Sequence, residues 1–96
     1  MNGARGEVAI MIDGRARTLC LTLGALAEIE TAFGCQTLGE LQARMRTLSA
    51  SELIEVLACL LRGGGETEAA QAVAALGVKP AEAARAVAEA FRAAVG

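Results

Sequence analysis

The chain contains no histidine, tryptophan or tyrosine, and its only aromatic residues are Phe33 and Phe91. Without histidine the chain lacks the usual general base at neutral pH and a common metal ligand. A net charge of −2 provides no basic surface for phosphates, and few rings are present for bases to stack on. We therefore expect a protein that is not an enzyme and does not bind nucleic acid.

Cysteine is also scarce. Cys20, Cys35 and Cys59 are odd in number and widely spaced, which fits neither a disulfide framework nor a zinc motif. Each lies within an apolar pattern, where no neighbouring histidine could favour the reactive thiolate. We interpret them as buried free thiols, with no catalytic residue, no bound metal and no cofactor.

Long apolar runs are missing, and nothing in the chain is long enough to span a bilayer. Residues 1–6 lack the charged and apolar regions of a secretory signal. We expect a cytoplasmic protein with no membrane partner. A length of 96 residues suits one small domain, residues 1–96, with an aliphatic core.

The first positive signal is a two-residue alternation of apolar side chains over Glu7–Ile12, which is typical of a β-strand. The dipeptide Asp13-Gly14 follows, and this pair favours a type I′ turn because both positions adopt positive φ readily. These features predict a β-hairpin over residues 6–22. Its apolar face needs helices to cover it, because an isolated two-stranded hairpin is marginally stable.

The predicted hairpin carries two arginines near its tip. A two-residue turn places Arg15 opposite Ile12 and Arg17 opposite Ile10. Their aliphatic stems could simply cover the sheet while the charges reach water, or the pair could meet an acidic partner surface. Either free edge of the hairpin could also accept a strand from another protein.

Helical patterns begin after the hairpin and predict a helical core over residues 23–62. Thr22, Thr37 and Ser49 each stand in an N-cap position, and the last two have a glutamate three residues later, as in a capping box. The third helix is so apolar that we expect it at the centre of the domain. We interpret glycines 63–65 as a flexible stop and not a phosphate-binding loop, because no Lys-Ser/Thr pair follows them.

Residues 66–96 form an alanine-rich helical end with helical patterns over 68–76 and 80–95. Pro80 suits the first turn of the last helix. One face of that helix carries the stripe Ala84, Val87, Phe91 and Val95. Small residues predict that this end is the least firmly anchored part, and the stripe could pack on the domain or on another chain.

Together these patterns predict an α+β fold, an N-terminal β-hairpin packed on a bundle of four to five α-helices. Several strings, in this order, also resemble a known family. They are Gly6-Glu7-Val8, Ile12-Asp13-Gly14-Arg15, Leu21 to Glu30, Leu48-Ser49-Ala50, Leu53-Ile54 and Leu61 to Gly65. Their order and spacing over residues 6–65 are similar to those of the small tail-cluster protein of gene transfer agents, which is classed with phage tail assembly chaperones.

The resemblance implies a non-enzymatic protein that binds the long, helical tape-measure protein during tail assembly, with the tail tube protein as a second candidate partner. The family has also been described as tail tube proteins, so a structural tail component is an alternative, and a small cytoplasmic adaptor or regulatory domain is a third. We favour the chaperone, because a tube wall usually needs a larger sheet than one hairpin. The candidate contact surfaces are Arg15 with Arg17, and the stripe on the last helix.

Overall fold

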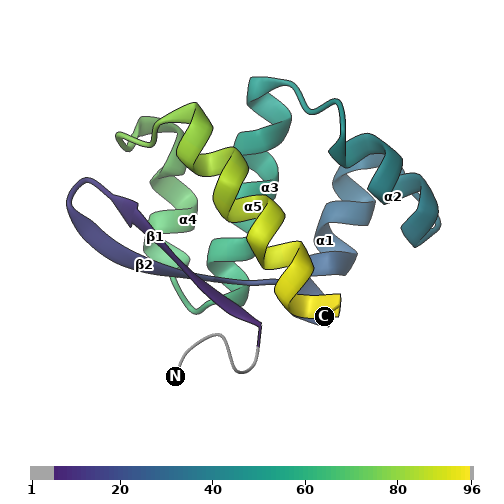
Figure 1. Ribbon diagram of the computed structural model, residues 1–96, viewed down its shortest axis with the longest axis horizontal. Helices are drawn as coiled ribbons and strands as arrows, with labels where there is room; N and C mark the ends of the chain where they lie inside the picture. Colours follow the sequence, from purple (N-terminus) through teal and green to yellow (C-terminus); the bar gives the residue numbers. More distant parts are fainter. Residues whose placement is uncertain (1–5, 96) are drawn as a thin grey trace.

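The computed structural model describes residues 6–95, and the side chain of Val95 lies outside the described part. An antiparallel hairpin of β1 (Glu7–Ile12) and β2 (Arg15–Cys20) is followed by helices, as Figure 1 shows. The helical elements are α1 (Leu23–Phe33), α2 (Leu38–Met45), α3 (Ala50–Gly63), α4 (Thr67–Ala72), the short 3₁₀ helix η1 (Val73–Ala75) and α5 (Pro80–Val95). The predicted α+β class is confirmed.

The hairpin has the turn and the register that the sequence predicts. Asp13 and Gly14 have φ values of 53° and 78°, as a type I′ turn requires. Ile10 pairs with Arg17, and Ile12 pairs with Arg15. The inward face of the hairpin is buried, with β1 against α5 and β2 against α3.

Side-chain caps fix the starts of the first three helices. Thr22 Oγ1 accepts from the Ala25 N–H at 3.0 Å. Ser49 and Glu52 form a complete capping box, because each side chain accepts a hydrogen bond from the backbone N–H of the other. The predicted box at Thr37 is only half formed. Thr37 Oγ1 accepts from the Glu40 N–H, but the Glu40 side chain accepts from the N–H of Gln36 and not from that of Thr37.

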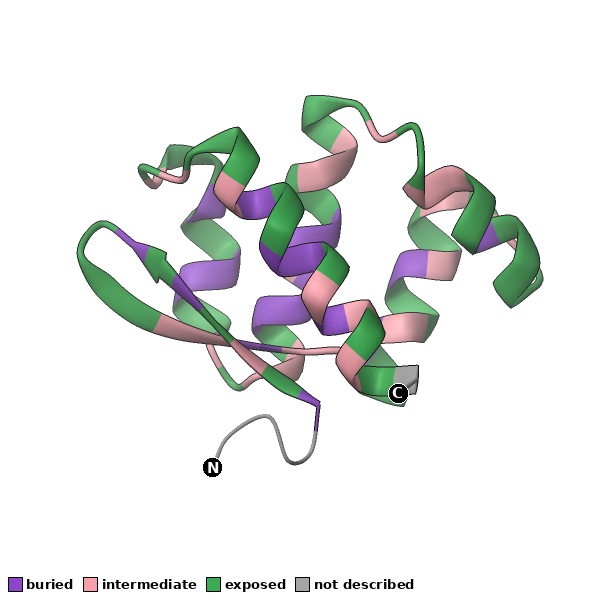
Figure 2. Ribbon diagram, viewed as in Figure 1, coloured by how far each residue is buried: buried purple, intermediate pink, exposed green. Residues whose placement is uncertain are grey.

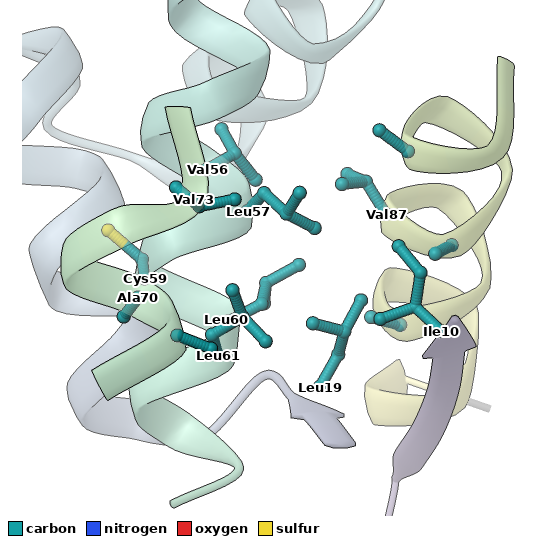
Figure 3. Packing of buried hydrophobic residues seen from close by; sticks show 14 of the residues in the cluster. Ile10, Leu19, Val56, Leu57, Cys59, Leu60, Leu61, Ala70, Val73 and Val87 are labelled. Carbon is teal, nitrogen blue, oxygen red and sulfur yellow. The ribbon is translucent and has the colours of Figure 1, made fainter. Parts of the chain in front are cut away.

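Helix α3 lies at the centre of the domain, as predicted. It packs against α1, α4, α5 and β2. Figure 3 shows Leu57 and Leu60 of α3 close to Ile10 and Leu19 of the hairpin, with Val87 of α5 facing them. The core is thus shared by the hairpin, the central helix and the last helix.

The expectation that the alanine-rich end is the least firmly anchored part is wrong. Ala86 and Ala90 of α5 are 0% exposed and Val87 is 5% exposed. Small side chains let α5 lie close to the domain, so this helix covers both β1 and α3. The helix predicted over residues 68–76 is instead divided into α4 and η1.

Helix α2 lies at the edge of the domain, as Figures 1 and 2 show. It buries Leu41, while Leu38 is 54% exposed. The Arg44 guanidinium lies 5.0 Å from the centre of the Phe33 ring and pairs with Glu52. The position of α2 leaves space between this helix and α5.

Candidate functional site

Two adjoining hollows follow α5, and we call them together the α5 groove. The first has a volume of about 560 Å³ and lies between α2, the start of α3 and α5. The second, of about 540 Å³, continues between α3, η1 and the start of α5. Leu48, Leu53 and Ala84 line both hollows, so the two form one continuous surface feature.

The walls of the groove are mainly apolar. Met45, Leu53 and Phe91 are half-buried, so each offers part of its surface to a partner. Ala84 and Ala88 of α5 are exposed and too short to fill the space in front of them. A concave apolar surface of this kind is a frequent binding site in proteins.

The charged side chains that line the groove are Arg46 and Arg92, and both are exposed. Neither forms an ion pair with any residue between 6 and 95. By contrast, Arg85 on the same helix is held by Glu82 and Glu89. The groove is therefore cationic in a chain whose net charge is −2.

The structure brings three of the predicted contact residues to this groove. Ala84, Val87 and Phe91 all line the first hollow. They differ in exposure, because Ala84 is exposed, Phe91 is half-buried and Val87 belongs to the core. The side chain of Val95 lies outside the described residues. The role of this stripe in binding stays a prediction.

The two predicted arginines of the hairpin lie away from the groove and differ from each other. Arg15 is exposed beside the turn. Arg17 is half-buried, and its Nη1 donates to Glu66 Oε1 at 3.2 Å. Because a carboxylate of the same chain already holds Arg17, Arg15 is the better placed of the two to meet an acidic partner.

Glycines 63 and 64 have a role that sequence reasoning missed. A Cβ on Gly63 would overlap the carbonyl oxygen of Cys20, and one on Gly64 would overlap that of Thr18. These glycines therefore let the end of α3 lie directly against the outer edge of β2. The interpretation of glycines 63–65 as a stop is correct, since α3 ends there. The expected flexibility is not found at Gly63 and Gly64, because both are tightly packed.

Beside these glycines, the Glu66 carboxylate accepts a hydrogen bond of 3.0 Å from the Thr18 N–H. This N–H points away from β1, where an added strand would otherwise pair. The outer edge of β2 is thus occupied from Thr18 to Cys20, and the idea that either edge could accept a strand does not hold for this part of β2.

A family model described as "Phage tail tube protein, GTA-gp10" matches residues 5–96. The chain belongs to this family. The resemblance found in the sequence is confirmed, and the protein is a tail-cluster protein of the kind found in phages and gene transfer agents. No curated protein and no solved structure matches the chain.

A third hollow, of about 420 Å³, lies between α1 and α3. It contains Cys59, Glu28 and Arg62, and Arg62 Nη2 donates to Glu28 Oε1 at 2.7 Å. Burial, with a smaller effect of Glu28, raises the pKa of Cys59 to about 11, so its thiol stays protonated at neutral pH. The Arg62 hydrogen bond lowers the pKa of Glu28. The trio therefore offers neither a thiolate nor a carboxylic acid with a raised pKa.

Within residues 6–95, no group of three or more acidic, cysteine or histidine side chains is arranged to hold a metal ion. No helix in the described part of the chain is long and apolar enough to cross a membrane.

Proposed function

We propose that the protein is a tail assembly chaperone that binds the tape-measure protein of its own tail cluster in the bacterial cytoplasm. The observation that carries this proposal is the open, apolar α5 groove in a member of a phage tail family. A groove of this kind suits transient binding of another protein's apolar surface.

The chemistry of the expected partner supports this function. A long helical protein exposes apolar stripes before its surroundings assemble, and such stripes aggregate when they meet water. A small domain that covers one of them keeps the partner soluble until the tube forms around it. The tail tube protein is a second candidate partner, because it must replace the chaperone on the same helix.

The description of the family as tail tube proteins favours a second function, that of a structural subunit in the tube wall. Two features weigh against it. Each strand of the hairpin has six residues, and the outer edge of β2 is occupied by Glu66 and by glycines 63 and 64. A neighbour could extend the sheet there only by displacing these groups. Because the chain belongs to a tail family, an adaptor or regulatory domain outside tail assembly has less support than either tail function.

Co-expression with the tape-measure protein of the same cluster tests the proposal. We expect a soluble complex that co-purifies at micromolar concentrations, and we expect mass spectrometry to find the protein absent from finished particles. A tape-measure protein that is equally soluble alone, with no complex recovered, would contradict the chaperone function. Stoichiometric presence in particles would favour the structural subunit.

A further inference from the structure

We infer that the α5 groove binds an amphipathic α-helix of the partner, whose apolar stripe enters the groove and whose acidic side chains pair with Arg46 and Arg92. This inference rests on the proposed function and names the surface and the partner chemistry that it uses. Three observations support it. They are the shape of the groove, its charge, and the lack of a suitable apolar stripe on the described part of a second copy of the chain.

The length of the groove suits a helix of a few turns. Its lining residues on α5 run from Pro80 to Arg92. At about 1.5 Å per residue, this is roughly 18 Å, which corresponds to a partner segment of about 12 residues. A segment of that length presents side chains at positions i, i+3, i+4 and i+7 to a groove. The gap above Ala84 and Ala88 gives such side chains room beside Phe91.

The charges define what kind of helix fits. Arg46 and Arg92 both line the first hollow, while the second hollow has no charged lining residue. Neither hollow is lined by a carboxylate, so no group in the groove would repel an acidic helix. Complementary charge fixes the register and direction of a docked segment more than its affinity. The acidic residues of the partner should therefore lie at the α2 end.

A second copy of this chain is the competing occupant, and its own surface suits the groove poorly. The large apolar side chains that are most exposed in the described part are Leu23, Met11 and Leu38. They lie on three different elements, α1, β1 and α2, and do not form a stripe along one helix. A separate helical protein is therefore the better occupant.

Competition for the full-length tape-measure protein tests this inference, with each variant displacing labelled wild-type protein from the co-expressed complex. Two variants alter the groove, Arg46→Glu with Arg92→Glu, and Ala84→Arg. Their controls are Arg15→Glu, which reverses one charge at the exposed hairpin tip where the groove variant reverses two, and Ala72→Arg, the same steric change at an exposed alanine of α4. Each position is exposed, so all four proteins should fold, and circular dichroism checks this.

We expect both groove variants to weaken binding by about tenfold or more, with the control variants within about twofold of the wild type. Added salt should weaken binding of the wild type and strengthen binding of the double charge reversal, because salt screens attraction in the first and repulsion in the second. Hydrogen exchange of the wild-type complex should show protection over residues 45–53 and 84–92.

The possible results separate this inference from the proposed function. If wild-type protein forms no complex, the proposed function fails and the inference fails with it. If the complex forms and the groove variants bind as well as the controls do, the function stands and the groove is not its site. Weakening by Arg15→Glu alone would move the site to the hairpin. Self-association that Ala84→Arg abolishes, without an effect on partner binding, would assign the groove to a second copy.

Discussion

The backbone N–H of Thr18 donates to Glu66 Oε2 at 3.0 Å and so joins two residues that are 48 positions apart in the sequence. The other oxygen of the same carboxylate accepts from Arg17 at 3.2 Å. One side chain thus satisfies an outward-facing donor of the hairpin edge and pairs with a half-buried cation. This link holds β2 against the segment that follows α3.

Replacing Glu66 by Ala should therefore lower the free energy of unfolding by about 1–3 kcal/mol, because the Thr18 N–H and the Arg17 guanidinium both lose their acceptor. Urea denaturation measures the change. Glu55→Ala is the control, since Glu55 is an exposed carboxylate on α3, and it should change stability by roughly 0.5 kcal/mol or less. Equal losses in the two variants would show that Glu66 makes no special contribution.

Gly63→Ala should destabilise the protein by at least about 1–3 kcal/mol, because the new methyl group would overlap the Cys20 carbonyl oxygen. Gly39→Ala provides the opposite case. That position lies within α2, and a Cβ there would make an ordinary contact of 3.9 Å with Thr37 Oγ1 without overlap, so alanine should be neutral or stabilise by up to about 1 kcal/mol. Thermal midpoints of the two variants that shift in the same direction would contradict the close packing of α3 on β2.

Leu57→Ala should cost about 2–5 kcal/mol, because this side chain is buried at the centre of the domain and its removal leaves a cavity. Ile54→Ala, three residues earlier on the same helix, should cost clearly less, since Ile54 is 38% exposed. Chemical denaturation of both variants compares them directly. A smaller loss of unfolding free energy at Leu57 than at Ile54 would show that α3 turns the opposite face toward the core.

The buried thiol of Cys59 predicts a loss of stability in alkaline solution. Its pKa rises from 9.0 to about 11 on folding, with burial as the main cause. As pH increases between these values, the unfolded chain releases the proton first, so unfolding becomes more favourable. The unfolding midpoint of the wild type should therefore fall more steeply from pH 9 to pH 11 than that of Cys59→Ala. Parallel curves would show that Cys59 ionises equally easily in both states.

The same burial predicts that Cys59 reacts with thiol reagents more slowly than Cys35 in the folded protein, since Cys59 is buried and Cys35 is half-buried. Mass spectrometry of partially modified protein identifies the order. Modification of Cys59 first would show that the helix pair around it opens readily.

The parts of the fold that could be predicted are those that depend on neighbouring residues in the sequence. Asp13-Gly14 determines the turn and, through it, the register of the hairpin. Thr22 and Ser49 satisfy backbone donors only a few residues away. Pro80 begins α5 as expected, because its fixed φ already suits a helix.

The parts that were missed depend on contacts between distant segments. In α5, alanine occurs on every face, so the larger side chains Val87 and Phe91 dominated the predicted stripe. The residues that actually pack on the domain include Ala83, Ala86 and Ala90. Only tertiary packing distinguishes these alanines from the exposed ones. The groove likewise cannot be seen in a sequence, because α2, α3 and α5 create it together.

The position of β1 against α5 has a consequence for folding on the ribosome. β1 spans residues 7–12 and the helix that covers it spans residues 80–95. The inner face of β1 therefore remains without its cover until nearly all of the described chain has left the exit tunnel. Contacts between such distant segments form late and slow folding. A nascent chain cannot offer its finished groove to a partner during translation, so partner binding must follow the release of α5.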